Sequence, residues 1–169
     1  MADRVALNSI KEAVQNMFLT ANTTTASPID LSANLSNSKR VKKILKVNPE
    51  MIIPQASFFP LVTCYVDSKD ISRDDIAQNQ LQTKRRATVD LKIVASVWNN
   101  NIVSVDEDPA DEDINYLMEN IELILRSDHT LGGTVTWQKP VDLKYFTSTM
   151  NVQNHIRTGI LTLQCSVFY

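Results

Sequence analysis

The chain of 169 residues contains 43% apolar and 21% charged residues, a composition typical of a folded domain and far from that of a disordered chain. Its formal net charge is −2, which excludes a strong general attraction to nucleic acid or to an acidic membrane. Only 3 glycines are present, and this argues against nucleotide-binding folds, because these folds use glycine where the backbone approaches phosphate.

The length predicts a single domain, residues 1–169. No apolar stretch approaches the roughly 18 residues that a membrane span needs, and the N-terminal residues lack the apolar core of a signal peptide. Cys64 and Cys165 lie in apolar strand patterns, so we expect two buried free thiols. The alternative is one disulfide between them. Together these features predict a cytoplasmic product.

The first predicted element is an amphipathic helix over residues 3–21, whose apolar side chains fall mostly on one stripe. Residues 22–38 are rich in Thr, Ser and Asn and predict a long loop or arm. The basic segment 39–47 is compatible with a short strand. Residues 58–67 predict a second strand, with Pro60 near its start.

Residues 68–84 are polar and poorly periodic, which predicts an extended arm that connects two strands of a hairpin. The segment 85–98 gives the clearest strand pattern in the chain, because apolar and mostly polar side chains alternate along it. A second helix is expected to start at Asp108, with Pro109 in its first position, and to carry an apolar stripe from Ile114 to Leu125.

Two further strands are predicted at residues 135–146 and 155–169. Pro140 cannot donate a ladder hydrogen bond, so the first of these strands is expected at a sheet edge. The order of elements predicts an α+β domain, a mainly antiparallel sheet of about four strands packed by two principal helices. Its predicted core comprises Val62, Cys64, Val89, Leu91, Ile93, Leu161 and Leu163, covered by Ile114, Leu117, Ile121 and Leu125.

Few residues are available for catalysis. His129 and His155 are the only histidines, and neither has a Cys, His or carboxylate neighbour at the spacing of a metal ligand or a catalytic pair. The sequence also lacks the glycine-rich loops of phosphate-binding and dinucleotide-binding motifs. We therefore predict no enzyme activity, no bound metal and no cofactor.

An acidic run, which includes Asp106, Glu107, Asp108 and Asp111, is the most conspicuous charge cluster. Such a run could bind a divalent metal or line a passage for DNA. Acidic side chains are also favoured at a helix N-terminus, and this position accounts for the run here. A solvent-facing or lumen-facing acidic surface is the alternative.

Basic residues gather at Lys42 and Lys43 and again at Lys84, Arg85 and Arg86. These clusters could contact nucleic acid, but no aromatic side chains alternate with them as in a single-strand stacking surface. A charged edge strand that resists aggregation accounts equally well for the first cluster. Ion pairs with the acidic helix of a neighbouring subunit are a further alternative, and we take the acidic and basic residues as the predicted interface.

The sequence resembles the tail terminator family of long-tailed bacteriophages. The resemblance is carried by the strand FFPLVTCYVD at 58–67, the hairpin arm, the strand RRATVDLKIVASVW at 85–98 and the acid-capped helix DPADEDINYLMENIELIL at 108–125. An N-terminal amphipathic helix precedes them and two strands follow. The resemblance covers residues 3–21 and 39–169. It consists of the same order of helices and strands and includes no catalytic motif.

The resemblance implies a structural virion protein that forms a ring, a hexamer in this family, on the end of the tail tube. Such a ring ends tube polymerisation and joins the tail to neck or connector proteins, and it contacts a sheath if the tail is contractile. It implies that DNA passes through the lumen without specific binding, and that the protein is assembled in the host cytoplasm into the tail–neck junction. Two alternatives are another head–tail connector and a small nucleic-acid-binding or enzymatic module. From the residues, we expect the arms 22–38 and 68–84 to join subunits.

Overall fold

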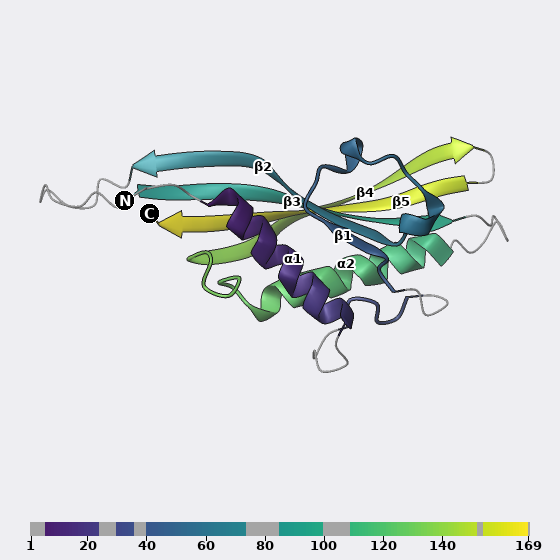
Figure 1. The fold of residues 1–169 in the computed structure, drawn as a ribbon, viewed down its shortest axis with the longest axis horizontal. Helices are drawn as coiled ribbons and strands as arrows, with labels where there is room; N and C mark the ends of the chain where they lie inside the picture. The colour runs from purple at the N-terminus through teal and green to yellow at the C-terminus, as the bar shows by residue number, and fades with distance from the viewer. Residues whose placement is uncertain are drawn as a thin grey trace, which may run out of the picture.

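The computed structural model describes residues 6–23, 30–35, 40–73, 85–99, 109–151 and 154–168. It confirms the predicted α+β class, with two principal helices and one mixed sheet (Figure 1). The helices are α1 (Leu7–Thr23) and α2 (Pro109–Ser127). The strands are β1 (Lys43–Leu45), β2 (Leu61–Arg73), β3 (Arg85–Asn99), β4 (Trp137–Asn151) and β5 (Asn154–Phe168).

The sheet has five strands in the order β1-β2-β3-β5-β4, which corrects the expected number of about four. Neighbours are antiparallel except β1 and β2, which are parallel and pair Lys43–Leu45 with Leu61–Thr63. Parallel strands need a long connection that returns the chain to its starting end. Residues 46–60, called the strap below, are that connection, and they contain the short 3-10 helices η2 (Pro49–Met51) and η3 (Ala56–Phe58).

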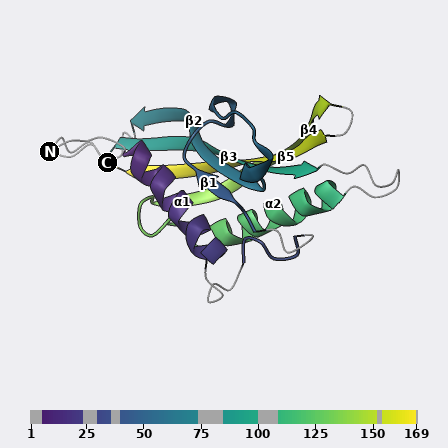
Figure 2. The same cartoon turned by 45° about the vertical axis from the view of Figure 1, so that its right-hand side comes forward.

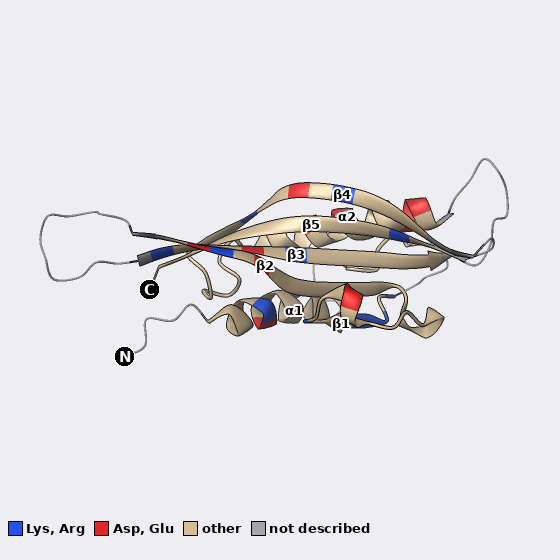
Figure 3. Cartoon of the chain, turned by 90° about the horizontal axis from the view of Figure 1, so that it is seen from above, with Lys and Arg blue, Asp and Glu red and all other residues tan. Residues whose placement is uncertain are grey.

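The two helices cover one face of the sheet, and the strap lies on the other, which we call the outer face (Figure 1 and Figure 2). A view onto the outer face has β1 and β4 at its two opposite edges (Figure 3). The edge position predicted for the strand that contains Pro140 is therefore confirmed, because that strand is β4.

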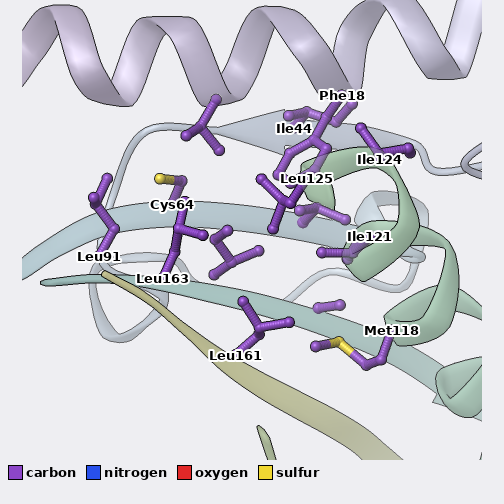
Figure 4. Packing of buried hydrophobic residues seen from close by; sticks show 14 of the residues in the cluster. Phe18, Ile44, Cys64, Leu91, Met118, Ile121, Ile124, Leu125, Leu161 and Leu163 are labelled. Atoms are coloured by element: carbon purple, nitrogen blue, oxygen red, sulfur yellow. The ribbon is translucent and has the colours of Figure 1, made fainter. Parts of the chain in front are cut away.

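A single large apolar cluster fills the space between the sheet and the helices (Figure 4). Side chains at alternate positions of β2, β3 and β5 point into it, as the alternation in the sequence predicts. The apolar stripe of α2 and residues of α1, among them Phe18, cover them. All eleven predicted core residues are buried: Val62, Cys64, Val89, Leu91, Ile93, Leu161, Leu163, Ile114, Leu117, Ile121 and Leu125.

Residues 30–35, within the predicted loop or arm 22–38, form a turn that packs against the domain. Leu31 and Leu35 are buried in the main core. The Asn120 side chain of α2 donates hydrogen bonds to the backbone oxygens of Ala33 (2.8 Å) and Leu31 (3.4 Å). Two leucines in an otherwise polar stretch therefore anchor this segment on α2. The rest of the predicted arm, from 24 to 29 and from 36 to 38, lies outside the described residues.

The second predicted arm, 68–84, also begins as regular structure. β2 continues to Arg73, and its residues Ser68–Arg73 pair with Asp90–Arg85 of β3 after a bulge at Asp67. Ser68 donates a side-chain hydrogen bond to Asp90 (3.1 Å) across this pair. Polar residues without periodicity thus extend the strand because their backbones pair with β3. Residues 74–84 lie outside the described residues.

Candidate interaction surfaces

The two histidines lie far apart, His129 in the turn after α2 and His155 near the start of β5. Within the described parts of the chain, no three or more His, Cys, Asp or Glu side chains are grouped so that they could hold a metal ion. Neither described helix is long and apolar enough to cross a membrane.

Cys64 and Cys165 are free and buried on the inner face of the sheet. β3 separates the strands that carry them, and strands two places apart are roughly 9–10 Å from each other, beyond the reach of a disulfide. Desolvation raises the pKa of each thiol to about 12. Both side chains therefore act as small apolar core residues and not as nucleophiles.

The predicted charged interface is only partly within the described residues, because Lys84, Asp106, Glu107 and Asp108 lie outside them. Arg85 and Arg86 begin β3. Arg86 donates from Nε to Ser166 Oγ (3.0 Å), and its guanidinium lies 6.0 Å from the Phe168 ring centroid.

Asp111 is in the first turn of α2, where its carboxylate is 3.7 Å from Arg157 Nε. Arg86 pairs with Phe168 near one end of β5, whereas Arg157 is near the other end. The structure therefore places Arg85 and Arg86 far from Asp111 along the strands, and neighbouring subunits in the same orientation and level would not bring these charges together.

Lys42 and Lys43 lie at the β1 edge and are exposed. The Lys43 ammonium is 5.8 Å from the Phe58 ring centroid in the strap, a distance that allows a cation–π contact. The backbone N–H of Lys42 donates to the Pro60 oxygen (2.7 Å), which ties the start of β1 to the start of β2. The two side chains are thus held on a fixed edge of the sheet.

An apolar groove of about 480 Å³ lies on the outer face. The strap forms one wall through Ile52, Pro54 and Phe58, and Phe146 of β4 lies at its other end. Between them, the floor consists of side chains from three strands: Leu61, Val94, Ser96, Ile156, Thr158 and Ile160. Ser96 and Thr158 hydrogen-bond to each other (3.0 Å), so these floor hydroxyls have a partner, and much of the remaining lining is apolar.

A second apolar cluster fixes the strap to the sheet and thereby keeps the groove open. Phe59, Leu61 and Ile156 are its buried members, with Ile52, Phe58 and Trp98 packed against them. The rings of Phe59 and Trp98 have centroids 5.4 Å apart at an interplanar angle of 54°, a tilted arrangement typical of aromatic pairs. The groove is therefore part of the fold, held by a small core of its own.

Farther along the outer face, away from the strap, the surface is polar. Asp90 accepts hydrogen bonds from Ser68 (3.1 Å) and Gln164 (3.2 Å), and Lys92 donates to Thr162 (2.8 Å). Lys92 also lies 3.5 Å from the Asp67 carboxylate. These polar groups form hydrogen bonds and an ion pair with one another within the chain. The apolar end of the outer face is therefore the stronger candidate for a surface that binds a partner.

A further hollow, of about 610 Å³, lies between α1 and the turn that follows α2. In that turn the Asp128 carboxylate accepts hydrogen bonds from the Thr130 side chain (2.7 Å) and from the backbone N–H groups of Thr130 (2.8 Å) and Gly132 (2.6 Å). These bonds lower the pKa of Asp128. The carboxylate is thus engaged in shaping the turn.

The groove was not predicted from the sequence, although the residues of one of its walls form a recognisable pattern there. The strap sequence NPEMIIPQASFFP contains five large apolar residues between prolines, an unusual content for a connection. Phe146 gave no separate signal, because an apolar residue in an edge strand is as often turned toward the core.

No family model matches the sequence, and no curated protein matches it.

Proposed function

We propose that the chain is a structural virion protein, a tail terminator that forms a ring on the phage tail tube. The ring, a hexamer if it follows the family that the sequence resembles, ends tube polymerisation and joins the tail to the neck. The observation that carries the proposal is the apolar end of the outer face. There a chain with a complete core of its own still presents a groove and exposed apolar side chains to a partner.

The order of elements gives further support. The segments that carry the resemblance, 58–67, 85–98 and 108–125, correspond to the start of β2, to β3 and to α2. They form the centre of the sheet and the helix that covers it. A small sheet packed by helices is the architecture that the resemblance implies. In the proposed ring, DNA passes through the lumen without specific binding, and the protein resides at the tail–neck junction of a virion assembled in the host cytoplasm.

The proposal is tested with purified protein and purified tail tubes. Electron microscopy of negatively stained samples should show six-subunit rings, alone or on one end of each tube. Tubes that polymerise in the presence of the protein should stop at the capped end. Binding to the portal and not to tubes would identify another connector of the virion. A protein that stays monomeric and binds neither particle would contradict the proposal and favour a small enzymatic or nucleic-acid-binding module.

A further inference from the structure

The strap carries two apolar side chains that do not line the groove. Met51 is 83% exposed and Ile53 is 80% exposed, the highest values for large apolar side chains among the described residues. They alternate with Glu50, Ile52 and Pro54, which do line the groove. The strap is fixed by its own apolar cluster, so it holds Met51 and Ile53 as a preformed apolar projection.

The groove and the projection reach opposite edges of the sheet. The strap leaves β1 and returns to β2 at one edge, and the groove extends from it to Phe146 on the edge strand β4. Phe146 is 51% exposed, and on the side of β4 away from β5 no described strand pairs with it. The end of the groove at Phe146 is therefore open toward whatever lies beside β4.

The two edges are level with each other along the strands. Ile44 pairs with Val62, Val62 with Ala95, Ala95 with Gly159, and Gly159 with Tyr145. This single row crosses the whole sheet from β1 to β4, and Phe146 is next to its last member. A second copy placed beside β4 in the same orientation would bring its β1 edge and strap to the level of Phe146.

Opposite charges lie at the same two edges. The β1 edge has the exposed Arg40, Lys42 and Lys43. The side of α2 next to β4 carries acidic residues: burial raises the pKa of Tyr145 in β4, and the negative charges of Glu119, Asp111 and Glu122 raise it further. Asp111 and Glu122 lie next to Arg157 and Arg126 of the same chain. Glu119 is therefore the acidic residue on this side that best complements the basic β1 edge.

From these four features we propose that neighbouring copies of the chain join head to tail. Met51 and Ile53 of one copy enter the Phe146 end of the outer-face groove of the next. The basic β1 edge of the first copy then faces the acidic α2 side of the second. This inference rests on the proposed ring and names the surfaces that close it.

A contact of this kind joins two different surfaces, so each copy keeps one free projection and one free groove. Repetition closes into a ring when the rotation between neighbours divides a full turn, and otherwise gives an open filament. Two side chains alone do not make a stable contact, which typically needs about 800 Å² per partner. The sheet edges and the helix α2 enlarge the contact beyond the apolar projection.

The first test removes the projection. Met51→Gln with Ile53→Gln should weaken self-association at least tenfold, measured by analytical ultracentrifugation over a range of concentrations. Phe168→Gln is the control, because Phe168 is an exposed apolar residue at the opposite end of β5 from the groove, and it should associate as the natural sequence does. Equal association of the double variant and this control would overturn the inference.

A mixing experiment tests the head-to-tail geometry. Phe146→Ser should also weaken self-association at least tenfold, and its fold is checked by urea unfolding. A mixture of this variant with the Met51→Gln, Ile53→Gln variant retains one intact projection and one intact groove, so it should form dimers and nothing larger. Absence of dimers in the mixture, with a natural chain that assembles, would contradict a contact between these surfaces.

Cross-linking gives a result that does not depend on loss of function. Met51→Cys with Phe146→Cys should form a ladder of disulfide-linked oligomers on mild oxidation, whereas each single variant lacks the partner thiol across the contact and should form no ladder. The natural thiols do not interfere, because Cys64 and Cys165 are buried. A ring without such a ladder would refute this contact and leave the proposed function intact, whereas a monomer without a ladder would refute both.

Discussion

Gly159 of β5 lies directly beneath Met118 of α2, and a methyl group on Gly159 would be 2.5 Å from Met118 Cγ and 2.7 Å from its sulfur. The close contact means that the sheet and the helix approach each other where β5 has no side chain. We predict that Gly159→Ala destabilises the fold by about 1–3 kcal/mol, the usual cost of overpacking a core. Urea unfolding followed by circular dichroism measures this loss.

The control for this prediction is a double-mutant cycle with Met118→Ala. That change alone should cost about 2–5 kcal/mol because it leaves a cavity. It should also make room for the new methyl group, so Gly159→Ala should cost much less in its presence. An equal loss in both backgrounds would show that the methyl group does not meet Met118.

The second prediction concerns the main core. Leu91 at the centre of β3 and Ile121 of α2 are fully buried in the same cluster. Replacing either with Ala should lower the free energy of unfolding by about 2–5 kcal/mol. Leu123→Ala, an exposed position on α2, serves as the control and should change stability by about 0.5 kcal/mol or less. Losses below this level at both core positions would mean that the inner and outer faces are wrongly assigned.

The buried thiols make stability depend on pH. Desolvation raises the pKa of Cys64 and of Cys165 from 9.0 to about 12. The folded state therefore holds these protons more tightly than the unfolded state. Their contribution to stability is complete below pH 9 and is lost as the pH rises from 9 toward 12, by at most about 1.4 kcal/mol per pH unit and thiol.

Urea unfolding between pH 8 and pH 10.5 compares the natural sequence with a Cys64→Ala, Cys165→Ala variant. The natural sequence should lose stability relative to the variant as the pH rises. Thiol titration adds a direct count, with two thiols reactive after unfolding without reductant and almost none before. A constant difference between the two proteins across this pH range would contradict the assignment of both thiols to the core.

The sequence predicted those parts of the fold that depend on local periodicity. The alternation in 85–98 and the helical stripe from Ile114 to Leu125 correspond to β3 and α2, because each element buries one face against the other. The short strand β1 lies within 39–47, which was compatible with a strand, but its parallel pairing with β2 was not predicted. Its pairing depends on where the 15-residue strap returns the chain, which is a property of the tertiary fold.

The candidate surface could be predicted even less. Leu31 and Leu35 lie in the core beside α2, where Asn120 donates hydrogen bonds to the backbone oxygens of Leu31 and Ala33, and no pattern within 22–38 shows this. The groove combines the strap with side chains of four strands, and only the strand order brings Phe146 to its far end. The relative positions of the predicted charges could not be derived from the sequence either. Lys42 and Lys43 share a level with the acidic side of α2 only through the register of the whole sheet.

The last prediction uses these charges. Lys42 at the β1 edge and Glu119 on α2 are both exposed, and the proposed contact brings Lys42 of one copy toward Glu119 of the next. Lys42→Glu should weaken self-association at low salt, and so should Glu119→Lys, while the two changes combined should restore it. Each exposed ion pair contributes only about 0.2–1 kcal/mol, so the expected effect is up to about fivefold for each contact. It should vanish near 1 M salt, where the screening length falls to about 3 Å. Lys69→Glu is the matched control, because it makes the same charge change on an exposed residue of β2 away from the β1 edge. If Lys69→Glu weakens association as much as Lys42→Glu does, or if the combined variant associates no better than either single one, then net charge and not this pair of edges governs assembly.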